Sequence, residues 1–85
     1  MTTTPREPTS SRDLWIRWGQ RLYAERDSRA LTQMQLAELS GVSQATISAI
    51  ERGVSGGSDL ARYELEKALR VPGLFALHML AEEAS

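Results

Sequence analysis

Apolar residues recur along this chain with the period of an α-helix, and no stretch alternates as a strand does. Trp15, Trp18 and Leu22 stand three and four residues apart, which places them on one face of a helix. This helix is expected to begin near Ser11 and to end near Arg26. We expect its tryptophans to pack in a core rather than to stack on nucleic-acid bases.

Two shorter helices follow, and turn signals mark their ends. Thr32 and Gln35 are spaced as a capping box, in which each side chain bonds the other residue's backbone N–H. Gly41 can adopt the left-handed conformation that ends a helix. Ser43 can cap the next helix, which is expected to stop at Gly53. The apolar residues expected to face the core are Leu36, Ala37 and Leu39 in the first of these helices and Val42, Ile47 and Ile50 in the second.

Two further helices are predicted beyond a flexible loop at residues 53–58. Ser58 or Asp59 can cap the fourth helix, and Pro72 suits the first turn of a fifth. The fifth would run through residues 74–84 and is apolar nearly all round its first two turns. The sequence therefore predicts an all-α fold of five helices. The core-facing residues of the fourth helix are expected to be Leu60, Ala61, Leu65, Ala68 and Leu69.

Length and composition narrow the class of protein. The 85 residues fit one domain, which we assign to residues 12–85. Residues 1–11 are rich in proline and hydroxyl groups and are expected to be a disordered tail, with a DNA-contacting arm as the alternative. The chain has no cysteine and one histidine, His78, which argues against disulfides and a metal site. No apolar run approaches the ~20 residues of a bilayer span, and no secretory signal appears, so we expect a cytoplasmic protein.

The residue types suggest neither catalysis nor strong electrostatic attraction to nucleic acid. No carboxylate pair and no nucleophile beside a base appears, and Gly56 and Gly57 lack the lysine and spacing of a P-loop. We therefore expect a protein that is not an enzyme and needs no cofactor. The net charge of −1 lacks the basic excess typical of nucleic-acid binding. Nearly all the basic residues are arginines, however, which suits bidentate contacts to phosphate or carboxylate.

Residues 33–52 carry the functional signal, because two short helices joined by a tight glycine-containing turn are typical of a helix-turn-helix. The outer face of the second helix holds short polar groups, an amide and methyl groups. Glutamine can bond adenine N6 and N7, and methyl groups can pack on a thymine methyl. A plain solvated face, the alternative, usually carries Glu and Lys, so this chemistry favours reading of the major groove. The outer residues are Ser43, Gln44, Ala45, Ser48 and Ala49.

Residues 18–53 resemble the lambda-repressor-like helix-turn-helix family, also called the Xre or Cro type; they read WGQRLYAERDSRALTQMQLAELSGVSQATISAIERG. The resemblance has no gap over this stretch and continues through LEKALRV to Val71. Its most specific part is the combination L-T-Q-x-x-L-A, S-G-V-S and T-I-S-x-I-E-R-G. The resemblance implies a lambda-repressor-like domain that binds double-stranded DNA and regulates transcription.

The resemblance and the outer-face chemistry together give the matching residues expected roles. Gln33 would contact a phosphate and support Gln44, which would read adenine at the start of the recognition helix. Arg26 and Glu51 would form a salt bridge beneath that helix, with a surface pair of little worth as the alternative. The base-reading residues are expected to be Gln44, Ala45, Ser48 and Ala49, and the phosphate-binding residues Gln33, Ser43, Thr46, Arg52, Arg29 and Arg21, with Arg17 also available.

Three positions depart from the family pattern. Glu25 stands where an apolar residue is usual, so the first helix could be rotated or loose there. Residues 54–57 read VSGG where the family usually carries a lysine and a proline, which removes a phosphate contact. Arg70 replaces a usual glycine at the end of the fourth helix. These departures and the net charge predict modest non-specific affinity for DNA.

The favoured interpretation is a small repressor that binds a palindromic operator as a homodimer, a pairing that could be completed on DNA. The alternative is an antitoxin that binds both a toxin partner and operator DNA. Phe75 and Met79 lie on a second apolar side of the expected fifth helix and are the predicted dimer interface. Their alternative place is in the core, under the first helix with Trp15.

Overall fold

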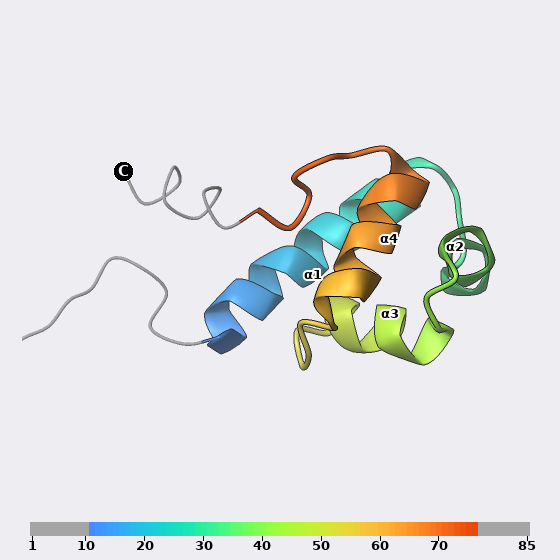
Figure 1. Ribbon diagram of the computed structural model, residues 1–85. Helices are drawn as coiled ribbons and strands as arrows, with labels where there is room; N and C mark the ends of the chain where they lie inside the picture. The colour runs from blue at the N-terminus through green and yellow to red at the C-terminus, as the bar shows by residue number, and fades with distance from the viewer. Residues whose placement is uncertain (1–10, 77–85) are drawn as a thin grey trace, which may run out of the picture.

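The computed structural model describes residues 11–76, which form four α-helices and no strand. The helices are α1 (Ser11–Ser28), α2 (Gln33–Ser40), α3 (Gln44–Glu51) and α4 (Asp59–Leu69) (Figure 1). The prediction of an all-α fold is confirmed. None of the helices in these residues has both the length and the apolarity that crossing a membrane requires.

Local hydrogen bonds mark the beginnings and ends of the helices, within about two residues of the positions that the sequence predicts. The Gln35 backbone N–H donates to Thr32 Oγ1 at 3.0 Å, and the Thr32 N–H donates to Gln35 Oε1 at 2.8 Å. This reciprocal pair is the predicted capping box, and it begins α2. Gly41 ends α2 with φ at 80°, a left-handed conformation that only glycine adopts without strain. Ser43 and Ser58 cap α3 and α4 through their hydroxyl groups.

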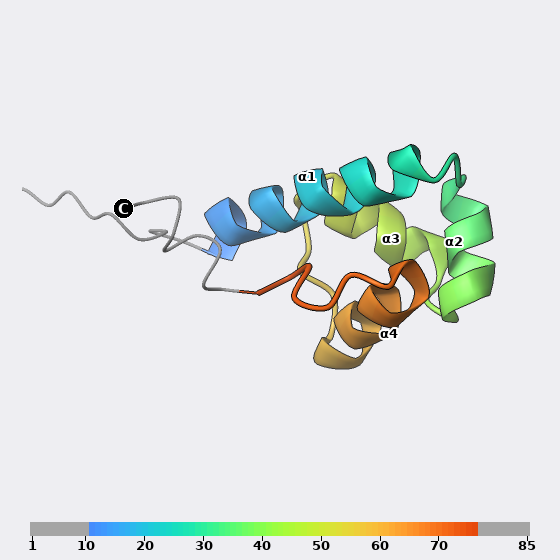
Figure 2. The ribbon, with the colours of Figure 1, turned by 90° about the horizontal axis from the view of Figure 1, so that it is seen from above.

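The four helices enclose one core. α1 runs along one side and packs on α3, while α2 packs against both α3 and α4 (Figures 1 and 2). α1 is continuous through Glu25, whose carboxylate binds Arg29, so the looseness expected there is not seen. Arg70 ends α4 in the left-handed conformation, with φ at 62°. The buried core residues are Trp18, Leu22, Leu36, Val42, Ile47, Ile50, Leu65, Leu69, Leu74 and Phe75.

Most of the predicted core-facing residues lie in this core, but two leucines do not. Trp18 is buried and Trp15 packs against the core from its edge, which confirms the core interpretation of the tryptophans. Leu39 on α2 and Leu60 on α4 are instead 62% and 66% exposed. No helix within residues 11–76 covers either side chain.

The predicted fifth helix is wrong where the structure describes it. Residues 71–76 form consecutive turns, closed by hydrogen bonds such as Leu74 N–H to Val71 O at 3.2 Å. The turns bring Leu74 and Phe75 into the core, and the Phe75 backbone N–H donates to the Glu66 carboxylate at 3.1 Å. The rest of that helix lies outside the described residues.

The predicted dimer interface is corrected accordingly. The Phe75 ring is buried edge-on against Trp18, with ring centroids 5.7 Å apart and planes at 81°. Phe75 therefore fills the core against the first helix, as the alternative had it, and offers no surface to a partner. Met79 lies outside the described residues.

α1 and α3 approach each other closely at Gly19. A Cβ atom at this buried position would lie 2.3 Å from the Ile50 carbonyl oxygen and 2.8 Å from that of Glu51. Both oxygens belong to the last turn of α3, so no side chain can move aside to make room. Glycine at this position therefore sets the distance between α3 and the helix that supports it.

Gly19→Ala should lower the free energy of unfolding by about 1–3 kcal/mol, because the new methyl group would push α1 away from α3. A loss of stability would indicate the close contact, because Gly→Ala at an exposed helical position raises the free energy of unfolding by about 0.5–1 kcal/mol. Urea denaturation followed by circular dichroism measures the effect. Gln20→Ala, at an exposed neighbour, is the control and should change stability by less than about 0.5 kcal/mol. Unchanged or increased stability of Gly19→Ala would contradict the close crossing.

Candidate DNA-binding surface

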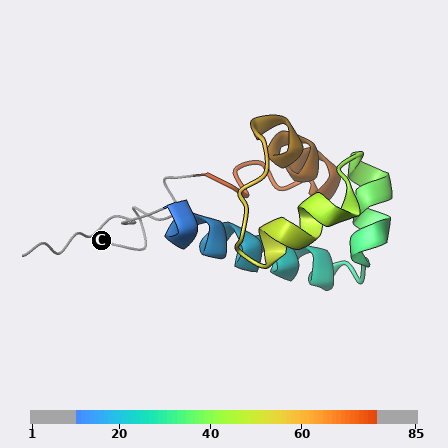
Figure 3. The ribbon, with the colours of Figure 1, turned by 90° about the horizontal axis from the view of Figure 1, so that it is seen from below.

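α3 lies on one face of the domain, between α1 and α4. Figure 3 views this face, with α3 nearest the viewer. Ile47 and Ile50 are buried and fix α3 to the core. The remaining side of the helix is exposed or half-buried and carries no charged side chain before Glu51. Among the predicted base-reading residues, the exposed ones are Gln44 and Ala45, and the half-buried ones are Ser48 and Ala49.

The start of α3 is closed by two hydroxyl groups. Ser43 Oγ accepts a hydrogen bond from the Thr46 backbone N–H at 3.1 Å and donates to Thr46 Oγ1 at 2.9 Å. The backbone N–H groups at the beginning of a helix have no partner within the helix, and the helix dipole makes this end favourable for an anion. The structure thus places Ser43 and Thr46 together at the N-terminal end of α3.

A part-buried ion pair joins α1 to the end of α3. Arg26 of α1 binds Glu51 at the end of α3 through two hydrogen bonds, Nε to Oε2 at 2.7 Å and Nη2 to Oε1 at 2.9 Å. The two side chains are only 13% and 7% exposed, so little water competes for these hydrogen bonds. The amide of Gln33, the first residue of α2, donates to the same Glu51 oxygen at 3.0 Å. One carboxylate therefore joins α1, α2 and α3.

Arg26 makes further contacts besides its hydrogen bonds to Glu51. Arg26 Nη1 donates to the Leu31 carbonyl oxygen at 2.7 Å, and the guanidinium lies 5.2 Å from the centre of the Tyr23 ring. Hydrogen bonding to Glu51 raises the pKa of Arg26 above its ordinary value and outweighs burial, which lowers it. The arginine therefore stays charged at every pH at which the domain would work.

Arg29, one of the predicted phosphate-binding residues, is used inside the fold instead. Its Nη1 donates to the Glu25 carbonyl and carboxylate oxygens, both at 2.7 Å, and its Nη2 donates to Leu69 O at 2.9 Å. Leu69 ends α4 on the side of the domain away from α3 (Figure 1). Arg29 therefore ties α1 to α4, and we remove it from the residues expected to contact DNA.

The other expected backbone contacts lie closer to α3 or on α1. Arg52 follows the last turn of α3, and its Nε donates to Ser48 Oγ at 3.2 Å. Arg21 is half-buried on α1, and its Nε has no hydrogen-bond partner among residues 11–76. Arg17 is exposed on the same helix.

Arg62 holds the loop between α3 and α4, a role that sequence reasoning missed. Its Nη1 donates to the carbonyl oxygens of Gly56 and Gly57 at 2.7 and 2.9 Å, and its guanidinium lies 4.7 Å from the centre of the Trp18 ring. A Cβ on Gly56 would lie 2.5 Å from Trp15 Nε1. The loop that composition marks as flexible is thus packed against two tryptophans. In the sequence, the role of Arg62 is indicated only by its position next to the apolar residues of α4.

These features define a class of protein, a helix-turn-helix protein that binds DNA. α2 and α3 are joined by a short turn at Gly41, and the exposed, uncharged start of α3 is supported by α1. A family model for helix-turn-helix domains matches residues 22–75, more than half of the chain. The chain belongs to the lambda-repressor-like, or Xre-type, helix-turn-helix family. It is a regulator that binds double-stranded DNA. No curated protein and no solved structure gives a significant match.

Glu51→Gln should lower the free energy of unfolding by about 1–3 kcal/mol, because it leaves the part-buried Arg26 guanidinium without its counter-charge. Chemical denaturation of the variant and the parent chain measures the loss. Glu64→Gln is the matched control: Glu64 pairs with Lys67 on the surface, and its removal should cost at most about 0.5 kcal/mol. Equal losses for the two variants would show that the contacts of Glu51 stabilise the domain no more than a surface ion pair does.

Proposed function

We propose that this protein is a sequence-specific repressor that places α3 in the major groove of a palindromic operator and so blocks access to a promoter. The observation that carries the proposal is the exposed, uncharged start of α3, held in place by the cluster around Glu51. A major groove admits a helix and presents a distinct pattern of donors and acceptors for each base pair. Occlusion of a promoter requires only that such a helix be bound there.

Gln44 is proposed as the main base reader. It is exposed in the first turn of α3, where its amide NH₂ can donate to adenine N7 and its carbonyl oxygen can accept from the N6 amino group. The methyl groups of Ala45 and Ala49 can pack on thymine methyls, and Ser48 can accept or donate. This surface discriminates by shape and hydrogen bonding, because it carries no charge.

Phosphate contacts are proposed around both ends of α3. Gln33 uses one N–H in its bond to Glu51, and its second N–H can donate to a phosphate oxygen. Ser43 and Thr46 would bind beside the start of α3, and Arg52 beside its end. Arg21 and Arg17 on α1 complete the proposed set.

The antitoxin alternative rests on a different surface. Met34 and Leu39 are exposed on α2, away from the base-reading side chains of α3, and could contact a protein partner. Two apolar side chains are a small fraction of the roughly 20 residues that each partner contributes to a stable interface. The repressor therefore remains the first proposal, and the antitoxin the second.

Gln44→Ala should weaken binding to an operator selected from random DNA by about 1–3 kcal/mol and relax the preference at one base pair in each half-site. The expected loss follows from the amide contacts to adenine. Quantitative binding to a panel of single-base variants measures both effects. Gln20→Ala, at an exposed glutamine on α1, is the control and should keep the preference. An unchanged base preference for Gln44→Ala would show that Gln44 does not read a base.

The salt dependence of operator binding should be shallow. With about 3–5 phosphate contacts per subunit, the slope of log affinity against log salt concentration should be near −3 to −4 per subunit. Arg52→Ala should reduce the slope by about 1, whereas Arg29→Ala should leave it unchanged, because Arg29 binds Glu25 and Leu69. A slope beyond roughly −8 per subunit would show that this contact set is far too small.

A further inference from the structure

Three polar side chains form a row along one side of α3. Gln44, Ser48 and Arg52 stand four residues apart, a spacing that places side chains on the same side of a helix in successive turns. Gln44 and Arg52 are exposed, and Ser48 is half-buried. Arg52 ends α3 with its backbone still in the right-handed helical region, at a φ of −82°, so its side chain continues the row.

A hydrogen bond joins the last two members of this row. Arg52 Nε donates to Ser48 Oγ at 3.2 Å, and the Arg52 backbone N–H donates to the Ser48 carbonyl oxygen at 3.0 Å. The neighbouring carboxylate, that of Glu51, is already bound to Arg26 and Gln33. Within residues 11–76 no carboxylate pairs with Arg52. Its guanidinium is therefore directed to a hydroxyl group of the base-reading surface rather than to an acidic side chain.

The hydroxyl hydrogen of Ser48 is not used within the described part of the chain. A serine inside a helix can donate to the carbonyl oxygen four residues before it, as Ser40 does to Leu36 O at 2.8 Å. Ser48 donates to no group in residues 11–76, although its oxygen accepts from Arg52. The hydrogen is thus available to a group outside these residues.

The bond from Arg52 limits what Ser48 can recognise. A serine hydroxyl has one hydrogen to donate and two positions that accept, so a serine alone can bond either kind of base edge. In α3 a cationic donor fills one accepting position. Its positive charge also disfavours the approach of a second donor, such as the amino group of adenine or cytosine. Donation to guanine O6 or N7, or to thymine O4, is therefore the favoured contact.

We propose that Arg52 makes Ser48 a hydrogen-bond donor and thereby selects guanine or thymine at the base that Ser48 contacts. Arg52 acts through Ser48 and is in this respect a positioning residue. The bond uses one of the five N–H groups of a guanidinium, so the others remain for the proposed phosphate contact. This inference rests on the proposed function, because it requires that α3 read bases in the major groove.

Arg52→Lys tests the proposal on an operator selected from random DNA with the parent chain. Lysine keeps the charge for a phosphate but lacks the fork that can bond a hydroxyl and a phosphate together. The variant should keep the parent's salt slope, whereas its preference for guanine or thymine at the Ser48 base should fall about 5-fold, the usual contribution of one hydrogen bond. Ser48→Ala identifies this base pair as the one whose preference it relaxes. In the Ser48→Ala background, Arg52→Lys should bring no further loss.

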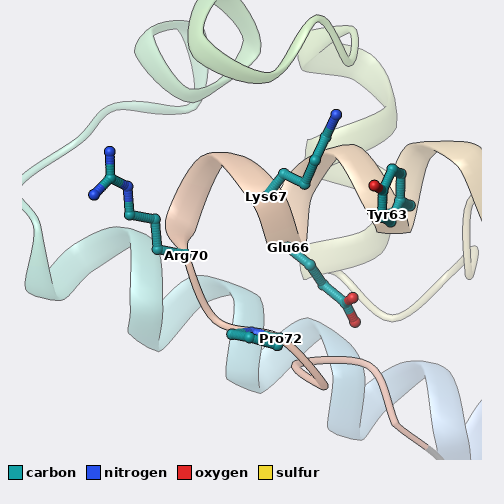
Figure 4. A pocket seen from close by; sticks show the side chains of 5 residues that line it. All are labelled: Tyr63, Glu66, Lys67, Arg70 and Pro72. Carbon is teal, nitrogen blue, oxygen red and sulfur yellow. The ribbon is translucent and has the colours of Figure 1, made fainter.

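Arg70→Lys is the matched control, because Arg70 is also an exposed arginine that ends a helix. Among the described residues, its guanidinium bonds no residue of α3. Arg70→Lys should therefore leave every base preference unchanged. Figure 4 shows Arg70 at the end of α4, where it borders a pocket of about 170 Å³ together with Tyr63, Glu66, Lys67 and Pro72.

The hydrogen bond itself can be measured without DNA. In heteronuclear NMR spectra of the free full-length protein, Ser48→Ala should shift the Nε–H signal of Arg52 and speed its exchange with water. The Nε–H signal of Arg70 should stay unchanged. An Arg52 signal that Ser48→Ala does not affect would overturn the proposal.

Three results on DNA would also overturn it while leaving the proposed function intact, provided that Gln44→Ala still relaxes its own base pair. They are a full base preference in Arg52→Lys, a parent chain that prefers adenine or cytosine at the Ser48 base, and a Ser48→Ala variant that relaxes no base pair. Failure of the proposed function is distinguishable, because no variant of α3 would then change any base preference.

Discussion

The carboxylate of Glu51 is the point on which the arrangement of α1, α2 and α3 depends. It sits at the end of α3, is 7% exposed, and accepts hydrogen bonds from Arg26 on α1 and Gln33 on α2. A buried carboxylate is strongly destabilising unless its charge and its lone pairs are satisfied. The three helices must therefore hold their relative positions for the domain to be stable. The orientation of the exposed face of α3 is fixed by the same requirement.

Close backbone contact between α1 and α3 reinforces this arrangement. Gly19 lets α1 approach the carbonyl oxygens of Ile50 and Glu51 more closely than any side chain would allow. The ion pair and the glycine crossing act on the same turn of α3, one through directional hydrogen bonds and the other through excluded volume. A rigid supporting scaffold is what a recognition helix needs, since its side chains must meet base edges with fixed geometry.

Three arginines of this chain hold segments of the domain together. Arg26, Arg29 and Arg62 bind carboxylates and backbone carbonyl oxygens, and each joins two segments that are distant in sequence or closes a loop. Their planar, forked donors suit such contacts better than a lysine would. This use of arginine explains how a chain with a net charge of −1 can carry many basic residues and still present few of them to a phosphate backbone.

The sequence by itself determined the ends of the helices and most of the core, because these depend on chemistry within a few residues. The Thr32–Gln35 capping box and the left-handed Gly41 are complete in a segment of ten residues. The exposed residues of α3 follow from its period in the same way, and the resemblance to a known family supplied the Arg26–Glu51 pair.

Only the tertiary structure decided what covers each apolar residue and what each charge binds. The sequence pattern placed Leu60 among the core-facing residues of α4, but its side chain is 66% exposed. Phe75 turns inward because Trp18 offers an edge-on contact and Glu66 accepts its backbone N–H. Arg29 is drawn from the DNA-binding set by a carbonyl oxygen forty residues away. Contacts between segments so distant in sequence leave no local pattern, because they form only once the helices have packed.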